Sequence, residues 1–316
     1  MRITIVGAGA IGCLVAAHLV RAGHEVELIG RPESVRAICE RGLRIQGSSD
    51  ATYSVEARTD LAPGRTPEAV ILSVKTFDLA AAAERLGHGL APLPLLLPQN
   101  GLGVEATAAA ALSRGGWSSP DPWIVRAVNS VPATLVGPGE VREGGSGEIL
   151  LADPPAAGGR SAAIALFRDL LRGAGLSVRT VPDLEREVWR KALVNAAINP
   201  VTALRGVPNG ELIEGPARAE ALTLLDEARG AAASAGYIFD PPSLVDDFDR
   251  VVRATASNRS SMLQDLERGR PTEIDSISGE ILRVGRAHGL DLPATRAAVE
   301  AIRRRADSGP ARPQPS

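Results

Sequence analysis

The sequence is poor in cysteine and histidine. It has two cysteines and four histidines in 316 residues. Cys13 and Cys39 are too few for a disulfide framework, which indicates a reducing compartment. The histidines stand at none of the spacings that bind zinc, so we expect no metal site.

The chain also lacks an excess of one charge and a long hydrophobic run. Its 35 Lys and Arg against 37 Asp and Glu give a formal net charge of −2, which argues against nucleic acid or an anionic membrane as partner. Prolines break the apolar stretch APLPLLLPQNG, and glycines interrupt the opening MRITIVGAGAIG, so neither resembles a membrane span or a signal peptide. We therefore expect a cytoplasmic protein that binds neither nucleic acid nor membrane.

The first half of the chain alternates short β-branched segments with helical patterns. These predict buried parallel strands and intervening helices, with strands at 3–6, 26–29, 70–74 and 93–97 and helices at 11–22 and 79–86. The alternation predicts an α/β fold with a doubly wound sheet of the Rossmann type. Beyond residue 123, WIVRAV and VGPGEVREGGSGEILLAD predict antiparallel strands added to that sheet, followed by a helix at 160–172 and a strand at 176–180.

From residue 183 the pattern is helical throughout. It predicts helices at 184–199, 209–214, 216–235, 243–267, 273–288 and 293–304. We therefore predict an N-terminal Rossmann domain over 1–182 and a C-terminal all-helical domain over 183–304. The Pro-, Gly- and Ser-containing tail, 305–316, is predicted to be disordered.

A glycine-rich motif follows the first predicted strand. In GAGAIG the three glycines suit a tight turn, close approach of a pyrophosphate, and close packing of helix on strand. The helix that begins there offers free N–H groups to phosphate. Candidate cofactor-binding residues are therefore Gly7, Ala8, Gly9, Ala10, Ile11 and Gly12, and a purely structural turn is the alternative.

The ends of the other strands bear on the choice of cofactor. The second strand ends in Gly30 and Arg31, with no carboxylate for a ribose hydroxyl, and an arginine there suits the 2′-phosphate of NADP. Lys75 either contacts a nucleotide phosphate or is a solvated loop lysine. Asn100 either forms a turn before Gly101 or directs its side chain at the nicotinamide.

The segment EVWRKALVNAAINPVTALRG is apolar nearly all round. Its polar residues Lys191, Asn195 and Asn199 are four apart, a narrow stripe roughly 12 Å long on one helix. The stripe faces either a buried ion-pair network or a ligand cavity. Beside a nicotinamide cofactor, a lysine ammonium can donate the proton that a ketone needs on reduction.

Two later segments carry further polar residues. In SNRSSMLQDLERG, the cluster that contains Asn258 and Ser261 either ends a helix or binds a carboxylate. In GRPTEIDSISGEIL, Glu273 and Asp275 are predicted in the first turn of a helix, where acids also simply favour the helix dipole.

Several motifs together resemble the 2-dehydropantoate 2-reductases, or ketopantoate reductases. They are GAGAIG, Lys75, QNGLG, WRKALVNAAINPVTAL, PNGEL and SSMLQDLERGRPTEIDSISGEIL, in the same order over nearly the whole chain. The resemblance implies NADPH-dependent reduction of ketopantoate to (R)-pantoate, in pantothenate and coenzyme A biosynthesis. It also implies two domains with the active site in the cleft.

The same resemblance implies a role for each matching residue. Lys191 falls on the general acid and Glu273 on the glutamate that orients the substrate. Asn195 and Asn199 fall on substrate-binding asparagines, and Asn258 and Ser261 on residues near the substrate's carboxylate. The remaining matches are Asn100, beside nicotinamide and substrate, and Arg31 and Lys75, at the adenosine 2′-phosphate of NADPH or NADP⁺.

One segment departs from the family pattern. Many members carry a threonine-rich stretch where this chain has AVNSVPA at 127–133, so Asn129 and Ser130 could indicate an altered pocket. The alternatives are a related reductase of another small 2-oxo acid and, in a different class, a non-enzymatic NADP-binding redox sensor. The sequence leaves open whether the chain is a monomer or a homodimer.

Overall fold

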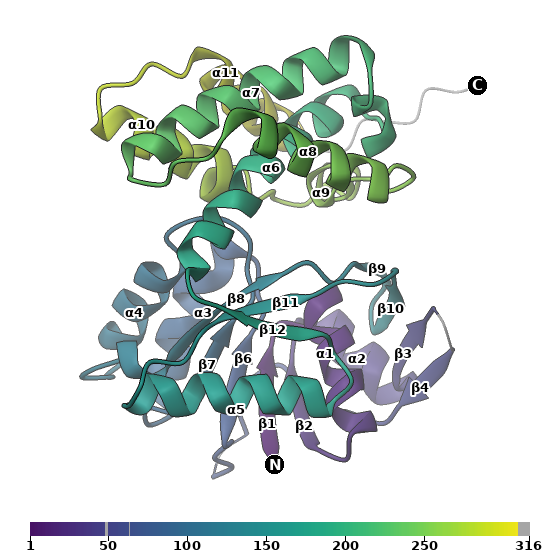
Figure 1. Ribbon diagram of the computed structural model, residues 1–316. Helices are drawn as coiled ribbons and strands as arrows, with labels where there is room; N and C mark the ends of the chain where they lie inside the picture. Colours follow the sequence, from purple (N-terminus) through teal and green to yellow (C-terminus); the bar gives the residue numbers. More distant parts are fainter. Residues whose placement is uncertain (48–49, 63, 309–316) are drawn as a thin grey trace. The chain divides into compact units, whose positions relative to one another are not determined.

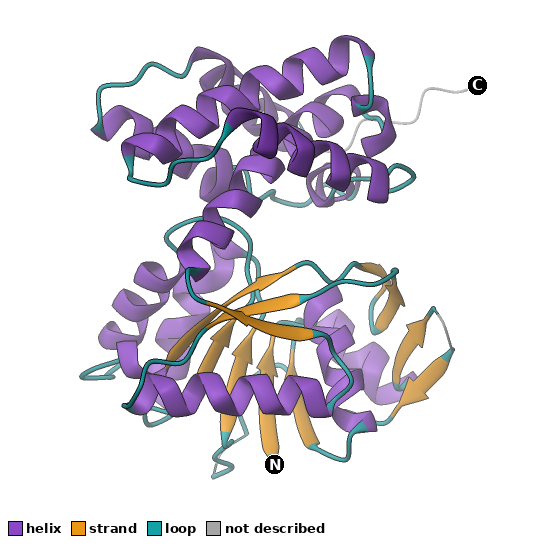
Figure 2. Cartoon of the chain, in the orientation of Figure 1, coloured by secondary structure: helices purple, strands orange, loops and turns teal. Residues whose placement is uncertain are grey.

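The computed structural model describes residues 1–47, 50–62 and 64–308. The chain forms two compact units. One, here the sheet unit, comprises Met1–Gln99 and Val104–Leu184; the other, the helical unit, comprises Asn100–Gly103 and the residues from Glu185 onward. Figure 2 shows the strands gathered in the sheet unit. The four residues from Asn100 lie within the segment that the sequence assigns to the N-terminal domain, and they pack instead with the helices.

The main sheet has eight strands in the order β12-β11-β8-β7-β6-β1-β2-β5. All strands from β8 to β5 run parallel, as the Rossmann-type prediction requires, while β11 is antiparallel to β8 and β12 is parallel to β11. The bounds are β1 Arg2–Val6, β2 Glu25–Ile29, β5 Glu56–Arg58, β6 Ala69–Leu72, β7 Leu95–Leu97, β8 Ile124–Asn129, β11 Ile149–Ala152 and β12 Val178–Val181.

Helices cover the two faces of this sheet with separate hydrophobic cores. Ile3 and Ile5 of β1 share one core with Phe167 of a helix, whereas Val70 and Leu97 lie in the other. The doubly wound prediction is therefore confirmed. The helices are α1 Ala10–Arg21, α2 Pro32–Arg41, α3 Thr76–Gly89, α4 Val104–Arg114, a short 3₁₀ helix η1 Asp121–Trp123, and α5 Gly159–Gly173.

The prediction that the strands after residue 122 are antiparallel and extend the main sheet is partly wrong. β8 is parallel to β7, and its six residues are all buried, as expected of a central parallel strand. The hairpin β9 Ala133–Gly137 and β10 Glu140–Glu143 joins a second sheet with β3 Leu43–Gln46 and β4 Ala51–Tyr53. In the main sheet, β11 is antiparallel to its neighbour β8. The sequence pattern did not predict β3, β4 or β5.

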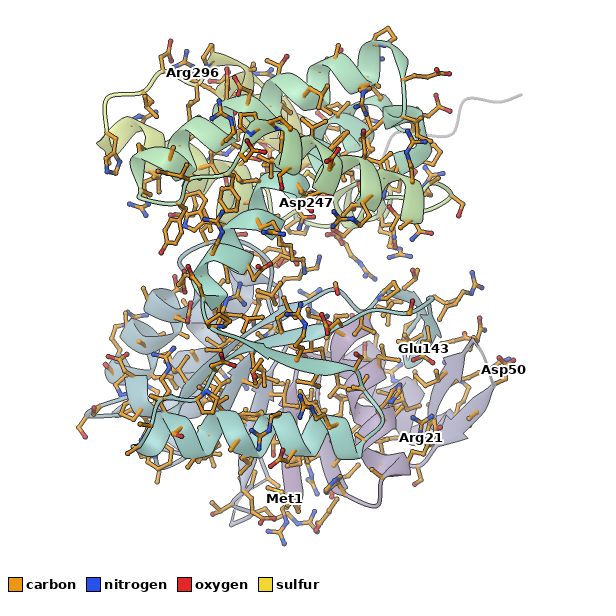
Figure 3. All side chains as sticks on the ribbon, viewed as in Figure 1. Met1, Arg21, Asp50, Glu143, Asp247 and Arg296 are labelled. Atoms are coloured by element: carbon orange, nitrogen blue, oxygen red, sulfur yellow. The ribbon has the colours of Figure 1, made fainter. Side chains whose placement is uncertain are left out.

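A polar contact between Glu143 of β10 and His18 of α1 joins the second sheet to α1, and Arg21 of α1 contacts the same histidine. Glu143 Oε1 lies 3.1 Å from His18 Nε2, and Arg21 Nη2 lies 3.0 Å from His18 Nδ1 (Glu143 and Arg21 are labelled in Figure 3). Because α1 carries the end of the glycine motif, this contact also fixes the helix that a phosphate would approach.

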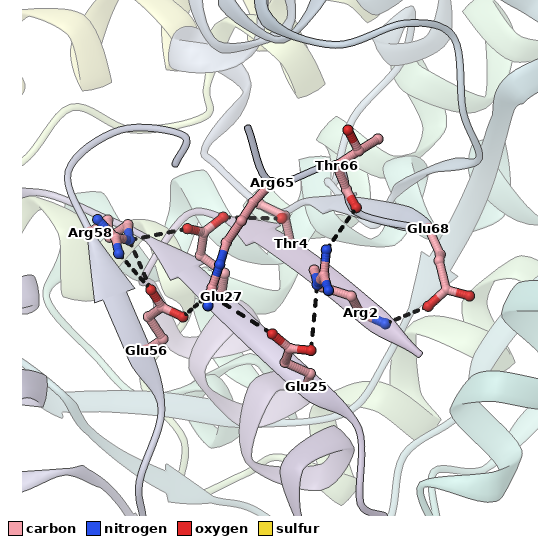
Figure 4. A network of polar contacts seen from close by, with 9 residues as sticks. All are labelled: Arg2, Thr4, Glu25, Glu27, Glu56, Arg58, Arg65, Thr66 and Glu68. Atoms are coloured by element: carbon pink, nitrogen blue, oxygen red, sulfur yellow. Dashed lines mark hydrogen bonds and ion pairs between the residues drawn. The ribbon is translucent and has the colours of Figure 1, made fainter. Parts of the chain in front are cut away.

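One face of the sheet over β1, β2 and β5 carries a network of charged side chains (Figure 4). Glu27 is buried in the middle of β2, accepts a hydrogen bond from the Thr4 hydroxyl at 3.3 Å, and pairs with Arg58 at 3.3 Å. Burial raises the pKa of the Glu27 carboxyl, while Thr4 and Arg58 lower it. Its carboxylate thus belongs to this network, and the charges protect the edge strand β5 from pairing with another chain.

The helical unit is built around the long helix α6, Leu184–Arg205, which continues through Pro200 beyond its predicted end at 199. Its apolar residues share a core with α7, α8 and α10. Figure 3 labels Asp247, a buried residue of α8 that pairs with Arg190 of α6 at 3.4 Å. The other elements are η2 Asn209–Leu212 (3₁₀), α7 Gly215–Ser234, α8 Pro241–Ala254, α9 Ser261–Glu267, a π-helical turn η3 Asp275–Gly279, α10 Glu280–Ala287 and α11 Pro293–Asp307.

Two of the predicted helices are not single regular α-helices in the structure. The helix predicted at 243–267 is two helices, because the Ser- and Asn-rich cluster ends α8 and Ser260 caps the start of α9 by accepting the Leu263 N–H at 3.2 Å. The helix predicted at 273–288 begins instead with the π-helical turn η3.

The last helix, α11, is longer than predicted. It reaches Asp307 rather than 304, because Ile302 is fully buried and Arg305 donates a hydrogen bond to the Leu204 carbonyl at 3.1 Å. Its start is held by Glu227 of α7, which accepts the N–H of Thr295 at 2.8 Å. Part of the predicted tail is therefore helical, and residues 309–316 lie outside the described residues.

We expect only one of the two cysteines to react in the folded protein. Cys13 is fully buried in α1, and burial raises its pKa to about 12, whereas Cys39 is exposed on α2. Because the thiolate is the nucleophile, an aromatic disulfide reagent should titrate one thiol natively and two after denaturation. Cys39→Ser should abolish the native reaction; equal rates for both thiols would contradict the assignment.

Candidate cofactor and substrate sites

The glycine motif forms the turn between β1 and α1. Gly7 has φ +118°, and a Cβ there would lie 2.7 Å from the Ser73 carbonyl carbon and from the Val74 nitrogen. A Cβ on Gly12 would lie 1.9 Å from the Gly7 carbonyl oxygen. The protein's own packing therefore requires glycine at both positions.

Gly9 is different, because the protein itself leaves space there. Its φ of −86° suits any residue, and a Cβ would meet no atom of the described residues within 4 Å. It is the N-cap of α1, and no side chain in the described part of the chain caps that helix. The open space, free N–H groups and positive end of the helix dipole fit a phosphate.

Two residues that sequence reasoning missed hold this loop. The Ser73 hydroxyl donates to the Gly7 carbonyl at 3.0 Å, and the Gln99 amide donates to the Val74 carbonyl at 3.2 Å and to the Leu72 carbonyl. Gly30 adds a third constraint, since a Cβ there would lie 2.6 Å from the Ala8 Cβ. All these residues follow strand ends at one edge of the sheet, and that position was their only signal in the sequence.

Arg31 and Lys75 belong to neighbouring helix starts. Arg31 is the N-cap of α2 and Lys75 the N-cap of α3. Arg31 Nη2 donates to Asp78 Oδ2 in the first turn of α3 at 3.2 Å, with the two side chains 65% and 48% exposed. Such an exposed pair contributes little stability, so a phosphate can replace the carboxylate. The structure thus brings the two predicted phosphate ligands to adjacent segments.

The polar stripe of α6 lies as the sequence predicts on one helix. Asn199 is 6% exposed, and Lys191 and Asn195 are half-buried. Pro200 interrupts the backbone bonding, and the Thr202 hydroxyl lies 2.8 Å from the Ile198 carbonyl and 2.8 Å from the Ser260 hydroxyl. These contacts tie the segment around Asn199 to the start of α9.

The two acids of the GRPTEID segment have different surroundings. Glu273 is 7% exposed, and Asn100 Nδ2 donates to its Oε2 at 3.4 Å. Asp275 is exposed and accepts the Arg303 Nε–H at 2.9 Å. Both were predicted in the first turn of an α-helix, but Glu273 precedes a π-helical turn. The structure therefore assigns Asp275 to an ion pair with α11 and leaves Glu273 as the buried acid beside Asn100.

The predicted residues Asn258 and Ser261 are exposed. The Asn258 carbonyl accepts the Asn209 N–H at 2.9 Å, and Ser261 is the first residue of α9. The buried hydroxyl of this cluster is that of Ser260, the helix cap.

The segment at 127–133 has structural contacts of its own. Asn129 is buried at the end of β8, and its Oδ1 accepts the Val131 N–H at 3.1 Å. The Ser130 hydroxyl donates to the Glu148 carbonyl at 2.8 Å. These contacts position the loop that follows the carboxyl end of β8.

Two features are absent from the described residues. These residues contain no group of three or more His, Cys, Asp or Glu residues that could hold a metal ion. In the same ranges, no helix has the length and apolar character needed to cross a membrane.

Gly9 and Gly12 provide a matched test of the cofactor site. Gly12→Ala should destabilise the protein, because its Cβ collides with the Gly7 carbonyl. Gly9→Ala should keep the wild-type melting temperature and weaken NADPH binding at least about tenfold, since its Cβ occupies space left for phosphate. Fluorescence titration with NADPH measures the second effect; unchanged affinity in Gly9→Ala would place the phosphate elsewhere.

Comparisons with known proteins identify the family. The family described as ketopantoate reductase PanE/ApbA matches residues 3–156, and its C-terminal family matches residues 183–306. The 2-dehydropantoate 2-reductase of Archaeoglobus fulgidus is 34% identical over 303 residues, which cover 96% of this chain and 97% of that protein. That of Vibrio cholerae is 31% identical over 304 residues, covering 96% and 97%.

Solved structures show the same fold. A PanE/ApbA family ketopantoate reductase from Ralstonia eutropha superposes with a TM-score of 0.85 at 32% identity, covering 98% of this chain and 99% of that one. A D-mandelate dehydrogenase with NADH and anilino(oxo)acetate gives 0.89 at 27% identity, with the same coverage. With both of its units matched and curated relatives aligned over nearly their full length, this chain belongs to the ketopantoate reductase family.

Proposed function

We propose that this protein reduces 2-dehydropantoate to (R)-pantoate with NADPH, a step of pantothenate and coenzyme A biosynthesis. The observation that carries the proposal is the near full-length similarity to curated 2-dehydropantoate 2-reductases. The polar stripe of α6 and the buried Glu273 lie in the parts of the chain that this similarity covers. The enzyme is an NADP-dependent oxidoreductase that acts on a CH–OH group.

The sheet unit, which we assign to a domain over residues 1–182, holds the cofactor. The loop Gly7–Gly12 takes the pyrophosphate at the N-terminus of α1, and Arg31 and Lys75 take the adenosine 2′-phosphate. Arg31 supplies a planar pair of N–H donors, and its partner Asp78 is exposed enough to release it. The bound cofactor supplies the hydride for the ketone carbon.

The helical unit, assigned to a domain over 183–304, supplies the groups for the substrate. Lys191 donates a proton to the ketone oxygen and, as a cation, stabilises the negative charge that develops there. Asn195 and Asn199, one and two turns further along α6, hydrogen-bond substrate oxygens. Asn258 and Ser261 bind the carboxylate end of the substrate, for which their exposed side chains are accessible.

Glu273 and Asn100 act together in this proposal. Since Asn100 Nδ2 donates to Glu273 Oε2, the carboxylate orients the amide, and the amide in turn fixes the carboxylate beside the substrate. Asn100 also contacts the nicotinamide.

The small molecule that binds to these residues in the proposal is a 2-oxo acid. Cytoplasmic location and a homodimer remain predictions.

The direct test is NADPH consumption by the purified protein, followed by absorbance. Ketopantoate is compared with pyruvate, 2-oxoisovalerate and 2-oxo-2-phenylacetate, the oxidised form of mandelate. The proposal expects rapid turnover with ketopantoate and slow turnover with the others. Preference for another acid would assign the chain to a related reductase with a different pocket, and tight NADPH binding without any turnover would favour a redox sensor.

Replacing Lys191 tests the proton donor. Lys191→Ala should lower kcat at least about 100-fold, the usual scale of general acid catalysis, with NADPH affinity little changed. Lys191→Arg keeps the positive charge but gives up its proton far less readily, so it should remain slow. Near-normal kcat in Lys191→Ala would remove the lysine from the mechanism, and recovery in Lys191→Arg would reduce its role to charge stabilisation.

Replacing Arg31 tests the choice of cofactor. Arg31→Ala should weaken NADPH binding about tenfold or more and leave NADH binding nearly unchanged, because only NADPH carries the 2′-phosphate. Arg36→Ala, an exposed arginine on the same helix, is the matched control. Equal losses for both cofactors would disprove the assignment.

A further inference from the structure

The chain following Glu273 enters its helix through a π-helical turn. In η3 the Gly279 N–H donates at 2.9 Å to the Ile274 carbonyl, five residues earlier. Such a turn holds one residue more than a turn of α-helix and occurs often at functional sites. Ile274 and Ile277 are 2% and 1% exposed, so the turn is fixed in the core of the helical unit.

The π-helical turn changes the partner of one carbonyl group. In a regular α-helix the Ser276 carbonyl would accept the N–H of Glu280. Here the Glu280 N–H is directed to the Ile277 carbonyl, and Ser276 accepts the N–H of Leu102 at 2.9 Å. The Leu102 side chain packs against the helical core as well. The segment that begins at Asn100 is therefore attached to η3 by a backbone bond and by an apolar contact.

Gly101 allows the segment that begins at Asn100 to lie close to the backbone of η3. Its φ is +89°, and a Cβ there would lie 2.4 Å from the Ser276 carbonyl oxygen and 2.9 Å from the Ser276 carbonyl carbon. Backbone atoms of a turn fixed in the core cannot move aside as a flexible side chain can. Any side chain at 101 must therefore push the segment away from η3.

Both members of the Asn100–Glu273 pair are connected to this turn. The Ser276 hydroxyl donates to the Glu273 carbonyl at 3.1 Å, and Asn100 directly precedes the glycine that lies against the Ser276 carbonyl. The hydrogen bond between the Asn100 amide and the Glu273 carboxylate, at 3.4 Å, is already long. A displacement of a few tenths of an ångström is enough to break it.

We propose that Gly101 and Ser276 are positioning residues, which set the separation between the Asn100 amide and the Glu273 carboxylate. The inference deepens the proposed function and rests on it. Neither residue touches the substrate. They act through the backbone contact between the glycine and the π-helical turn, so that two side chains far apart in the sequence meet at one place.

The same segment offers a matched control for this inference. Gly103 also has a positive φ, +69°, but the nearest described atom to a Cβ there would be Glu280 Oε2, at 3.9 Å. Alanine therefore introduces similar backbone strain at 101 and at 103, and only at 101 does it collide with the π-helical turn. Comparing Gly101→Ala with Gly103→Ala separates the collision from the strain.

The experiment measures kcat and KM for ketopantoate, NADPH affinity by fluorescence, and melting temperature for wild type and both variants. We expect kcat/KM to fall about 10- to 100-fold in Gly101→Ala, the scale of an ångström-sized misplacement, and to stay within about threefold in Gly103→Ala. NADPH affinity should change less than about threefold in both. Equal losses in the two variants, or normal turnover in Gly101→Ala, would overturn the inference.

A second pair covers the case in which Gly101→Ala does not fold. Ser276→Ala removes only the hydroxyl that holds the Glu273 carbonyl, and Ser276→Thr retains a hydroxyl. We expect a loss in kcat of about threefold or more in the first and recovery in the second, with unchanged melting temperature. Identical kinetics in the alanine variant and wild type would contradict the role of Ser276. Failure of wild type itself to reduce ketopantoate would count against the proposed function, not against the positioning contact.

Discussion

The structure depends on a backbone-to-backbone contact that is too close to leave space for side chains. Where β1 ends, the Gly7 backbone lies against the segment that follows β6, and the Gly12 backbone lies against the Gly7 carbonyl, too close for a Cβ at either position. This contact fixes the N-terminus of α1 at the edge where the parallel strands end. The Ser73 hydroxyl then donates to the Gly7 carbonyl, and the Gln99 amide donates to the Val74 carbonyl in the segment that follows β6. The position of the loop proposed to bind the pyrophosphate follows from that packing.

In the helical unit, too, packing determines where the polar side chains lie. The apolar residues of α6 are buried in a core, and Lys191, Asn195 and Asn199 lie along one line of the helix. The two neighbouring acids Glu273 and Asp275 are separated by burial and by partner: one lies beside an asparagine, while the other forms an exposed ion pair with Arg303. Burial and partner thereby distinguish the acid proposed for the substrate site from a structural acid only two residues away.

The sequence predicted the parts of this fold that follow from the spacing of apolar residues and from positions where only glycine fits. The glycine motif, the four parallel strands before residue 98 and the helical second half all rest on such patterns, and the structure confirms them. The direction of β8 was wrong because a short apolar strand carries no signal for parallel or antiparallel pairing. The short strands β3, β4 and β5 were missed because each has only three or four residues, too few to establish a period.

Other features lie beyond what a single sequence shows. One π-helical turn changes the helical period over only five residues, so η3 could not be distinguished from the first turn of an α-helix. Ser73 and Gln99 bind backbone carbonyls, and small polar residues do so in many loops. The candidate residues of the substrate site were predicted from their motifs, whereas the contacts that place Asn100 beside Glu273 depend on segments more than 170 residues apart.

The ion pair between Arg31 and Asp78 has a consequence for the free protein. Asp78 acts as an internal counter-ion: it neutralises the guanidinium and keeps it extended toward the start of α3. A phosphate that takes its place meets an arginine already oriented, and the displaced carboxylate stays in the first turn of α3, where the helix dipole favours it. The Arg31 guanidinium is therefore paired with an anion both in the free protein, where the anion is Asp78, and in a complex, where it would be the phosphate.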